Sequence, residues 1–480
     1  MKKVLFASFE SLPFVKTGGL ADVVYALPKA INKKKYQVKV VLPLLKKIKD
    51  NYYDKLDYLD TITVSSNYIQ ENAGIRRMFN EGIEYLFIEN DNYFNRDNVY
   101  GYDDDVSRFS FFNLAVIEMM IKLNDYPDII HCHDYHTGLI AALCKLRYFR
   151  IDEIRKIKHV FTIHNLVYQG EYDKKVLFDL LGFNYNDYEN GTLKFGDHTN
   201  FMKIAIATSD IITTVSKSYA KEIQTREYGE RLEEILKYRK EDLYGIVNGI
   251  DTDLFNPKTD NIHTNYSLSN YLKGKKENKR ALQEKLGLRQ DENTMLIGVV
   301  SRLTFQKGLE LISSCIDWFV CGNNVQLAIL GTGEDRYEGL FRYLENSSKG
   351  QIAFYRGYNE ALAHDMYAGL DLLLMPSLFE PCGISQLISM RYGTLPLVRE
   401  TGGLKDTVEP YNEYTKEGRG FSFGPYSSES FRRVLQYAYD VFHKDKKSWH
   451  QLMKNAMKYD VSFKTSAKEY ENIYEKVLKK

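Results

Sequence analysis

The sequence predicts an α/β protein made of two doubly wound domains, each with a mainly parallel sheet, and three observations predict it. Short apolar runs alternate with amphipathic stretches, the pattern of repeated strand–helix units. This alternation restarts after an N-G-I turn at Asn248. The chain has 480 residues, and a single hydrophobic core stops growing at roughly 250–300 residues. Two domains of similar size are therefore expected.

In the first half, apolar runs bounded by polar segments mark the strands. The expected strands are Val4–Phe9, Gln37–Leu42, Glu84–Ile88, Ile129–His131, His159–Ile163 and Ile211–Val215. Leu20, Val24, Leu27 and Ile31 are spaced by 4, 3 and 4 residues, which places them on one helix face. The segment Asp103–Leu123 is expected to form a second helix.

In the second half the same pattern predicts further strands. They are Met295–Val300, Gln326–Leu330, Gln351–Tyr355, Leu372–Met375 and Leu395–Val398. After Lys307, the side chains of Leu309, Ile312, Ile316 and Phe319 share one apolar face, which predicts a single helix. The polar, lysine-rich segment Asp251–Asp291 is expected to be a linker with a surface helix.

We therefore predict domains at residues 1–247 and 248–458. Residues 459–480 would form a C-terminal helix that packs back on the first domain; its helix-like, charged part is Ser466–Lys480.

Composition and charge argue against several classes of protein. Lys and Arg number 65 against 64 Asp and Glu, a net charge of +1, which argues against a nucleic-acid partner. No apolar run approaches the ~20 residues that span a bilayer. The first residues, M-K-K-V-L-F-A-S-F-E, read as a buried strand rather than a signal peptide. The five cysteines have no disulfide or metal spacing, which favours a reducing compartment, so a cytoplasmic protein is expected.

Polar residues gather where the strands of the first half end, and this is where doubly wound sheets bind ligands. The first strand leads into F-V-K-T-G-G-L-A-D, which puts Lys16, Gly18 and Gly19 just before a helix. Paired glycines let a backbone approach a ligand, and helix N-termini attract anions. The loop suits a phosphate or a sugar nucleotide, although a plain tight turn would look the same.

The next strand ends in H-C-H-D-Y-H. Its three histidines, His131, His133 and His136, invite a zinc hypothesis. Alternate residues of an extended segment point to opposite sides, however, so convergence on one metal is not expected. Asp134 and Tyr135 suit sugar recognition better, with a carboxylate for hydroxyls and a ring for the pyranose face.

Two further strands of the first half end in polar motifs. F-T-I-H-N-L adds His164 and Asn165 at the same edge, although a lone histidine is usually structural. V-N-G-I-D-T-D could hold a metal through its two aspartates, but Asn-Gly favours a turn with a helix cap.

In the second half, S-R-L-T-F-Q-K-G places Arg302 and Lys307 in a strand-to-helix loop, where a diphosphate would be a natural partner; a solvated loop is the alternative. L-G-T-G-E-D-R lacks the third glycine of a dinucleotide fingerprint because Arg336 takes its place.

L-F-E-P-C-G-I-S-Q-L puts Glu380 beside a helix start at Gly383–Ser385, either as a helix cap or as a partner for sugar hydroxyls.

Taken together, six motifs closely resemble the bacterial glycogen synthase family, glycosyltransferase family 5, whose pattern plant starch synthases share. They are K-T-G-G-L, H-D-Y-H, T-I-H-N-L-x-Y-Q-G, V-N-G-I-D, S-R-L-T-x-Q-K-G and F-E-P-C-G-x-x-Q-L, the last followed by Y-G-T-L-P-L-V-R-x-T-G-G-L-x-D-T-V. They run in the family's order from Glu10 to Val408.

The resemblance implies a GT-B fold, in which two Rossmann-like domains face a central cleft. It also implies a retaining transfer of glucose from ADP-glucose to the non-reducing 4-hydroxyl of an α-1,4-glucan, with no cofactor and no metal. The implied catalytic residues are Lys16 near the donor sugar and diphosphate, His164 against the donor sugar, Arg302 and Lys307 on the leaving ADP, and Glu380 on the glucose hydroxyls. The resemblance also implies the substrate-binding residues. Gly18 and Gly19 would lie beside Lys16, the residues Asp134, Asn165 and Asn248 would contact sugar, and Tyr358 would stack on adenine. Cys382, Gly383, Ile384 and Ser385 would surround the phosphate, and Glu10 and Tyr135 would face the acceptor.

The chain departs from the family pattern at Tyr135, where the family usually has tryptophan, so acceptor affinity or chain-length preference could differ. Ile388 stands where broader glycosyltransferases carry a second glutamate, an absence usual for the synthases. The main alternative function is a UDP-sugar-dependent glucosyltransferase of the same fold. A non-catalytic glucan-binding protein is disfavoured by the intact Lys16, Arg302, Lys307 and Glu380.

Overall fold

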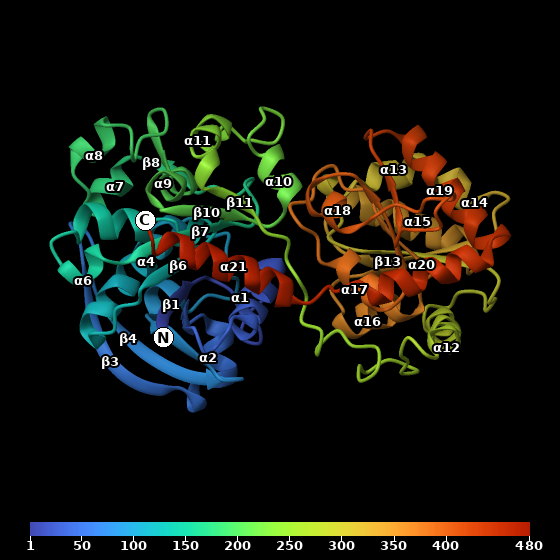
Figure 1. Ribbon diagram of the computed structural model, residues 1–480, viewed down its shortest axis with the longest axis horizontal. Coiled ribbons are helices and arrows are strands. Elements are labelled where there is room, and N and C mark those ends of the chain that lie inside the picture. The colour runs from blue at the N-terminus through green and yellow to red at the C-terminus, as the bar shows by residue number, and fades with distance from the viewer. The chain divides into compact units, whose positions relative to one another are not determined.

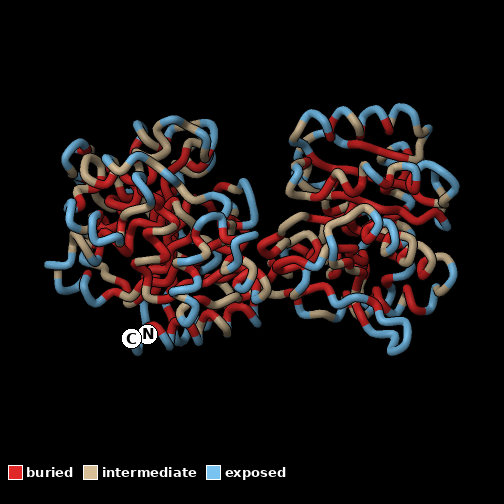
Figure 2. Tube along the Cα trace, turned by 90° about the horizontal axis from the view of Figure 1, so that it is seen from above, coloured by how far each residue is buried: buried red, intermediate tan, exposed pale blue.

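The protein is described by a computed structural model that covers residues 1–480. The chain forms two compact units (Figure 1). Unit 1 comprises Met1–Asn248 together with Phe463–Lys480, and unit 2 comprises Gly249–Ser462. In each unit the buried residues fill the interior of the sheet and helix layers, and exposed residues follow the loops and outer helix faces (Figure 2).

Unit 1 is built on a nine-stranded sheet in the order β11-β10-β7-β6-β1-β2-β5-β4-β3. Its strands are β1 Lys2–Ala7, β2 Tyr36–Pro43, β3 Asp57–Ser65, β4 Gln70–Asn80, β5 Ile83–Glu89, β6 Ile129–His133, β7 Lys158–Ile163, β10 Ile211–Thr214 and β11 Leu243–Gly245. All neighbouring strands are parallel except at the edge formed by β3, β4 and β5, which pair antiparallel. A separate hairpin joins β8 Glu171–Asp173 and β9 His198–Asn200.

Unit 2 has a six-stranded parallel sheet in the order β14-β13-β12-β15-β16-β17. Its strands are β12 Met295–Val300, β13 Val325–Gly331, β14 Ile352–Arg356, β15 Leu372–Met375, β16 Leu395–Arg399 and β17 Phe421–Phe423. Numbered along the unit, this is the order 3-2-1-4-5-6 of the doubly wound nucleotide-binding fold.

Helices connect these strands. Those of unit 1 are α1 Gly19–Ala30, α2 Lys46–Tyr52, α3 Asp91–Phe94, α4 Asp105–Leu123, α5 Ile140–Ala142, α6 Asp152–Arg155, α7 Lys175–Asp179, α8 Tyr185–Glu189, α9 Phe201–Thr208, α10 Lys217–Glu222, α11 Glu233–Tyr238 and α21 Phe463–Val477. Those of unit 2 are α12 Tyr271–Lys285, α13 Leu309–Ser314, α14 Ile316–Val320, α15 Asp335–Ser347, α16 Glu360–Gly369, α17 Ser385–Arg391, α18 Gly402–Thr407, α19 Ser428–Lys444 and α20 Lys446–Lys458.

Each sheet has a point where the strand order reverses, between β1 and β6 in unit 1 and between β12 and β15 in unit 2. Ligands of doubly wound sheets bind beyond the carboxyl ends of the strands at such a point. The loops that follow these four strands carry Lys16, Asp134, Lys307 and Glu380. The topology therefore brings candidate residues together in pairs, one pair in each unit.

The structure breaks the helix that was predicted after Lys307. Two short helices, α13 and α14, replace it, with Cys315 between them at φ −111° and ψ 19°. The hydroxyls of Ser313 and Ser314 donate to the carbonyls of Leu309 and Leu311, and such bonds compete with regular helix formation. The apolar periodicity was correct, because Leu309, Ile312 and Phe319 are buried.

Helix α12 lies on the surface of unit 2, as predicted, with one face exposed and the other buried. Lys275 and Lys279 are buried on its inner face. The ammonium of Lys275 donates to the carbonyl of Leu370 and the hydroxyl of Thr394, both at 2.6 Å. The polar composition did not reveal this buried face, because these long side chains pack their stems inside while their amines bind helix and strand ends.

Helix α21 packs on unit 1, as the last segment was expected to do. Figure 1 shows this red helix among the blue and green elements of the unit. The hydroxyl of Tyr474 is buried 2.8 Å from Nδ1 of His131 in β6, and the Tyr474 ring packs edge-on against Tyr36 of β2. The end of the chain thus supports the strands that lead to the candidate site.

Candidate active site

In unit 1, the loop after β1 is ordered by the carboxylate of Glu10. Glu10 is buried, and both of its carboxylate oxygens accept hydrogen bonds. Oε2 accepts from the backbone N–H of Thr17, and Oε1 accepts from the Thr17 hydroxyl at 2.6 Å and from the Tyr100 hydroxyl at 2.8 Å. Glu10 therefore fixes the K-T-G-G turn, and Tyr100 holds Glu10 from a distant loop.

Lys16 lies at the start of α1, where Nζ donates to Oδ1 of Asp22 at 2.8 Å. The first turn of α1 has no side-chain cap, so its backbone N–H groups are available to an anion. A Cβ atom added to Gly18 would meet no atom within 4 Å, and its φ of −159° suits any residue. Local packing thus leaves open space beside Gly18, in front of the helix.

Asp134 has a strained backbone at the end of β6, with φ 57° and ψ 173°, a region that is nearly exclusive to glycine. Its Oδ1 accepts the backbone N–H of His164 at 2.8 Å, and its own N–H donates to the carbonyl of Thr162. Burial raises the pKa of the carboxyl to about 7, although the backbone N–H groups of His164 and Asn165 oppose this. Strain of this kind concentrates at functional sites.

His164 is oriented by a second histidine. Its Nε2 lies 3.0 Å from Nδ1 of His133, whose ring stacks on that of His131 at 4.3 Å. Burial lowers the pKa of His164 to about 3 and that of His133 well below its usual range, so both rings are neutral near pH 7. One ring must therefore donate to the other.

The buried Nε2 of His133 has no hydrogen-bond partner, and this decides the direction of the bond. Donation from His164 would leave a proton on that orphaned nitrogen, and buried N–H groups without partners are rarer than unpaired acceptors. We therefore assign the donor role to Nδ1 of His133. His164 then keeps its own proton on Nδ1, which makes that nitrogen a hydrogen-bond donor.

Tyr135 and Asn165 complete this edge of unit 1. The Tyr135 ring contacts Phe109 edge-on at 5.6 Å. A Cβ atom at Gly170 would lie 2.4 Å from the Tyr135 ring, and Gly170 has φ +65°, so the last glycine of T-I-H-N-L-V-Y-Q-G makes room for this ring. Asn165 turns the following loop, because its Oδ1 accepts the N–H of Val167 at 3.2 Å.

Asn248 is the last residue of unit 1 and is only 6% exposed. Its Oδ1 is buried without a hydrogen-bond partner. A buried unpaired amide oxygen lowers stability by roughly 1–3 kcal/mol unless something binds it. Among the candidate residues of unit 1, Asn248 is therefore the one whose buried side-chain oxygen most plainly lacks a hydrogen-bond partner.

In unit 2, the loops after β12 and β15 meet through an ion pair. Nζ of Lys307 donates to Oε2 of Glu380 at 2.7 Å, and both side chains are largely buried. The hydroxyl of Ser377 donates to the same oxygen at 3.0 Å. Glu380 is thus no helix cap, and the two residues that the sequence placed in separate motifs form one charged pair.

Glycines allow the loops of unit 2 to approach the segment that carries Glu380 closely. A Cβ atom at Gly308 would lie 2.0 Å from the carbonyl oxygen of Pro376, and Gly308 also has φ +70°. At Gly402 the corresponding distance is 2.0 Å to the carbonyl oxygen of Glu380. The K-G and T-G-G glycines therefore hold backbone against the segment that carries Glu380.

Arg302 and Tyr358 are exposed in loops at the carboxyl edge of the same sheet. Arg302 follows β12 and makes no salt bridge. Tyr358 follows β14 and is 75% exposed. An unpaired guanidinium and an exposed ring are the groups that a diphosphate and a flat base would bind.

Cys382, Gly383 and Ile384 form the turn before α17, and Ser385 is the first residue of that helix. Gly383 has φ +74°, and the first turn of α17 has no side-chain cap. The buried Gln386 stabilises this turn, since its Nε2 donates to the carbonyls of Cys382 and Gly383 at 3.1 and 3.0 Å. The backbone N–H groups at this helix start are free to meet an anion.

Sequence reasoning missed Tyr100, Ser377 and Gln386, which position Glu10, Glu380 and the turn before α17. Gln386 lies within the motif F-E-P-C-G-x-x-Q-L and Ser377 lies just before it, so both could have been found there. Tyr100 could not, because its link to Glu10 spans 90 residues.

The structure holds no group of three or more His, Cys, Asp or Glu side chains that could bind a metal ion. His131 of the H-C-H-D-Y-H motif bonds instead to Thr162 and Tyr474. In D-T-D, Oδ1 of Asp251 accepts the N–H groups of Asp253 and Leu254, which is the turn that Asn-Gly favoured. The helices include none with the length and apolar character needed to cross a membrane.

The chain is similar to known proteins over its whole length. The model of the starch synthase catalytic domain matches residues 3–238, and that of glycosyl transferases group 1 matches residues 278–458. A glycogen synthase of Clostridium botulinum is 46% identical over 477 residues, 99% of each chain. The catalytic domain of Starch Synthase IV from Arabidopsis thaliana, solved bound to ADP and acarbose, is 33% identical with a TM-score of 0.91 over 100% of both chains.

Sucrose-phosphate synthase from Thermosynechococcus elongatus, at 13% identity and a TM-score of 0.60 over 100% of both chains, shares the fold alone. The two Rossmann-like units are those of the GT-B fold. The chain belongs to the glycogen synthase family, ADP-glucose-dependent glucosyltransferases that elongate α-1,4-glucan.

Proposed function

We propose that unit 2 binds ADP-glucose at the carboxyl ends of β12 and β15, with Arg302 and Lys307 on the diphosphate and Glu380 on the glucose hydroxyls. The observation that carries this proposal is the Lys307–Glu380 pair at the point where the strand order reverses. An ammonium for phosphate and a carboxylate for hydroxyls, 2.7 Å apart, match the two parts of a sugar nucleotide. The ADP held by the solved starch synthase relative supports the same donor.

In the proposed reaction, the bond from glucose to the diphosphate breaks, and negative charge grows on ADP. Lys307, held by Glu380, and the backbone N–H groups at the start of α17 are already oriented to stabilise that charge, and the exposed Arg302 adds a further positive charge. Tyr358 stacks on adenine, and Cys382 and Ile384 shape the turn around the phosphate. Glucose passes with retention of configuration to the non-reducing 4-hydroxyl of the glucan.

Unit 1 contributes the groups that contact sugar. The half-buried Asp134 and the orphaned Oδ1 of Asn248 accept hydrogen bonds from sugar hydroxyls, and Nδ1 of His164 donates a hydrogen bond to a sugar oxygen. Lys16 and the uncapped backbone N–H groups at the N-terminus of α1 help to bind the diphosphate. Tyr135 offers its ring to the acceptor, and Glu10 acts by ordering the loop that carries Lys16.

Donor competition tests this proposal. Purified protein is incubated with a maltooligosaccharide and equal concentrations of ADP-glucose and UDP-glucose, and nucleotide release and chain extension are followed. The proposal expects ADP release matched to glucose added, with ADP-glucose strongly preferred. Equal or greater use of UDP-glucose would contradict it. A cytoplasmic location remains a prediction from the sequence.

A further inference from the structure

Arg108 of α4 is a fully buried charge that the proposed reaction does not use. Its side chain pairs with Asp105, three residues earlier on the same helix. Its Nη2 is buried without a hydrogen-bond partner. Replacement of such a buried pair by apolar side chains of similar size is often neutral or stabilising. Stability alone therefore does not account for an arginine at this position, and its contacts indicate another role.

The guanidinium of Arg108 binds the backbone of the segment that precedes α4. Nε donates to the carbonyl of Tyr93 at 2.7 Å, and Nη1 donates to the carbonyl of Val99 at 3.1 Å. Tyr93 belongs to α3, and Val99 lies in the connection from α3 to α4, residues 95–104. This connection contains no helix or strand of its own, so anchors of this kind determine its path.

The Arg108–Asp105 pair fixes both neighbours of Tyr100 in this connection. The carbonyl of Val99, on one side, accepts from Arg108. On the other side, the backbone N–H of Gly101 donates to Oδ2 of Asp105 at 2.8 Å. Gly101 has φ +97°, a conformation that glycine adopts readily. One pair of charges thus sets the direction in which the Tyr100 side chain leaves the backbone.

The side chain of Tyr100 reaches from this connection to the loop after β1. Its hydroxyl donates to Oε1 of Glu10 at 2.8 Å. Glu10 also accepts the backbone N–H and the hydroxyl of Thr17, the residue after Lys16. A continuous series of contacts therefore runs from the buried ion pair to the loop that carries Lys16.

We propose that Arg108 is a positioning residue for glucosyl transfer. Together with Asp105 it fixes Tyr100, and the Tyr100 hydroxyl then keeps Glu10 bound to the loop of Lys16. The proposal rests on the proposed function, in which Lys16 helps to bind the donor diphosphate. Groups that are held in place before the substrate arrives avoid the free-energy cost of ordering them during the reaction. Loss of the anchor should therefore slow transfer although Arg108 itself acts only through other residues.

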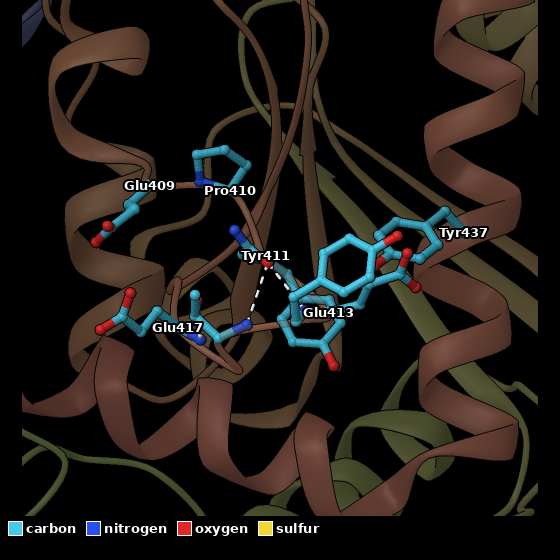
Figure 3. Close-up of a pocket in the computed structure, with 9 residues that line it drawn as sticks. Glu409, Pro410, Tyr411, Glu413, Glu417 and Tyr437 are labelled. Carbon is cyan, nitrogen blue, oxygen red and sulfur yellow. Dashed lines mark hydrogen bonds between the residues drawn. The ribbon is translucent and has the colours of Figure 1, made fainter.

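The mildest test removes a single hydroxyl. Tyr100→Phe keeps the ring, and its matched control is Tyr437→Phe, at a tyrosine that stacks on Tyr411 in a pocket of unit 2 (Figure 3). In steady-state kinetics with a maltooligosaccharide acceptor, Tyr100→Phe should lower kcat/KM for ADP-glucose about 3- to 10-fold. Tyr437→Phe should behave as wild type. Unchanged kinetics in Tyr100→Phe would overturn the proposal.

Arg239 offers a matched control for Arg108 itself. It is also largely buried, donates to the carbonyls of Ile206 and Ser209 at 2.6 and 2.8 Å, and pairs with Asp242 three residues away. Ser209 precedes β10, so these contacts lie at the amino edge of the sheet, opposite the candidate site.

Lysine keeps the charge at either position but lacks the planar fork that binds several acceptors at once. Arg108→Lys and Arg239→Lys should therefore both lower the unfolding free energy. Only Arg108→Lys should also lose turnover, by about 10-fold or more. The double variant Arg108→Lys, Tyr100→Phe should be no slower than Arg108→Lys alone, because both changes act through one hydroxyl. Equal turnover in the two lysine variants, or multiplied losses in the double variant, would contradict the proposal.

Amide hydrogen exchange adds a readout that is independent of catalysis. In Tyr100→Phe and Arg108→Lys, the peptide that contains Thr17 should exchange about 3-fold faster or more, while β1 stays protected. In Arg239→Lys the same peptide should exchange as in wild type. Wild-type protection of this peptide in both test variants would overturn the proposal. The measurement needs no donor, so its outcome is separate from the proposed function, which a preference of the wild-type protein for UDP-glucose would contradict.

Discussion

Nζ of Lys307 and Oε2 of Glu380 lie 2.7 Å apart at the point where the strand order of unit 2 reverses. Each charge is buried with the other as its main partner, so each side chain depends on the other for its stability. The same pair presents both charges that a sugar nucleotide requires. If the pair acts on the donor as proposed, stability and catalysis are linked at this position.

Loss of either partner should harm both properties. Lys307→Met leaves the Glu380 carboxylate buried without a cation, and we expect a loss of about 3–5 kcal/mol in unfolding free energy. The double variant Lys307→Met, Glu380→Gln should regain much of that stability but not the activity, since kcat should fall ~10²–10³-fold in each variant. Chemical denaturation and ADP release measure the two effects. Additive losses of stability in the double variant would show that the pair is not coupled.

The orientation of His164 should depend on the donor at His133. Asparagine can place an amide N–H near the position of Nδ1, whereas leucine cannot. We expect His133→Leu to lower kcat about 10-fold with little change in the KM for ADP-glucose, and His133→Asn to keep most of the activity. Equal activity of the leucine and asparagine variants would argue against a positioning role.

The charge state of His164 can be followed directly by nitrogen NMR of labelled histidines. Burial lowers its pKa to about 3 from an ordinary value of 6.5. The folded protein therefore holds a neutral ring protonated on Nδ1 from pH 5 to 8. Below pH 6.5 the unfolded chain takes up protons that the folded state refuses, so His164 lowers the unfolding free energy as pH falls. A His164 signal that titrates near pH 6.5 in the folded protein would contradict this environment.

The strained backbone of Asp134 predicts a difference between two variants that both remove its carboxylate. Glycine tolerates φ 57° and ψ 173°, and alanine does not. Asp134→Gly should therefore be about 1–2 kcal/mol more stable than Asp134→Ala, even though glycine gives the unfolded chain more freedom. Both should lose activity. Thermal unfolding measures the difference, and an alanine variant of equal or greater stability would be the opposite result.

Gly308 offers a similar pair of substitutions. Gly308→Ala places a Cβ 2.0 Å from the Pro376 oxygen, whereas Gly287→Ala, at a similar φ of +66°, meets nothing within 4 Å. We expect both variants to lose about 1 kcal/mol from the positive φ. Only Gly308→Ala should lose substantially more, together with activity, because it pushes apart the loops that carry Lys307 and Glu380. Indistinguishable variants would mean that the close approach is unimportant.

Most of both sheets could be predicted from sequence because their strands are short, buried and apolar. The hairpin of β3 and β4, at one end of the sheet, was missed because both strands are largely polar. The candidate residues were found because strand ends, glycines and charges mark them locally. The hydrogen bonds of Tyr100 to Glu10 and of Tyr474 to His131 could not be found, since folding brings these partners together from distant segments.

We expect Arg302 to bind the donor diphosphate, and a comparison of two arginine variants tests this most directly. Arg302 is exposed at the end of β12 without an ion pair, and Arg280 is an exposed arginine on α12 of the same unit. Steady-state kinetics with ADP-glucose and a maltooligosaccharide should give ~10²–10³-fold lower turnover for Arg302→Ala and wild-type turnover for Arg280→Ala. Near wild-type turnover in Arg302→Ala, with the fold intact, would contradict the account.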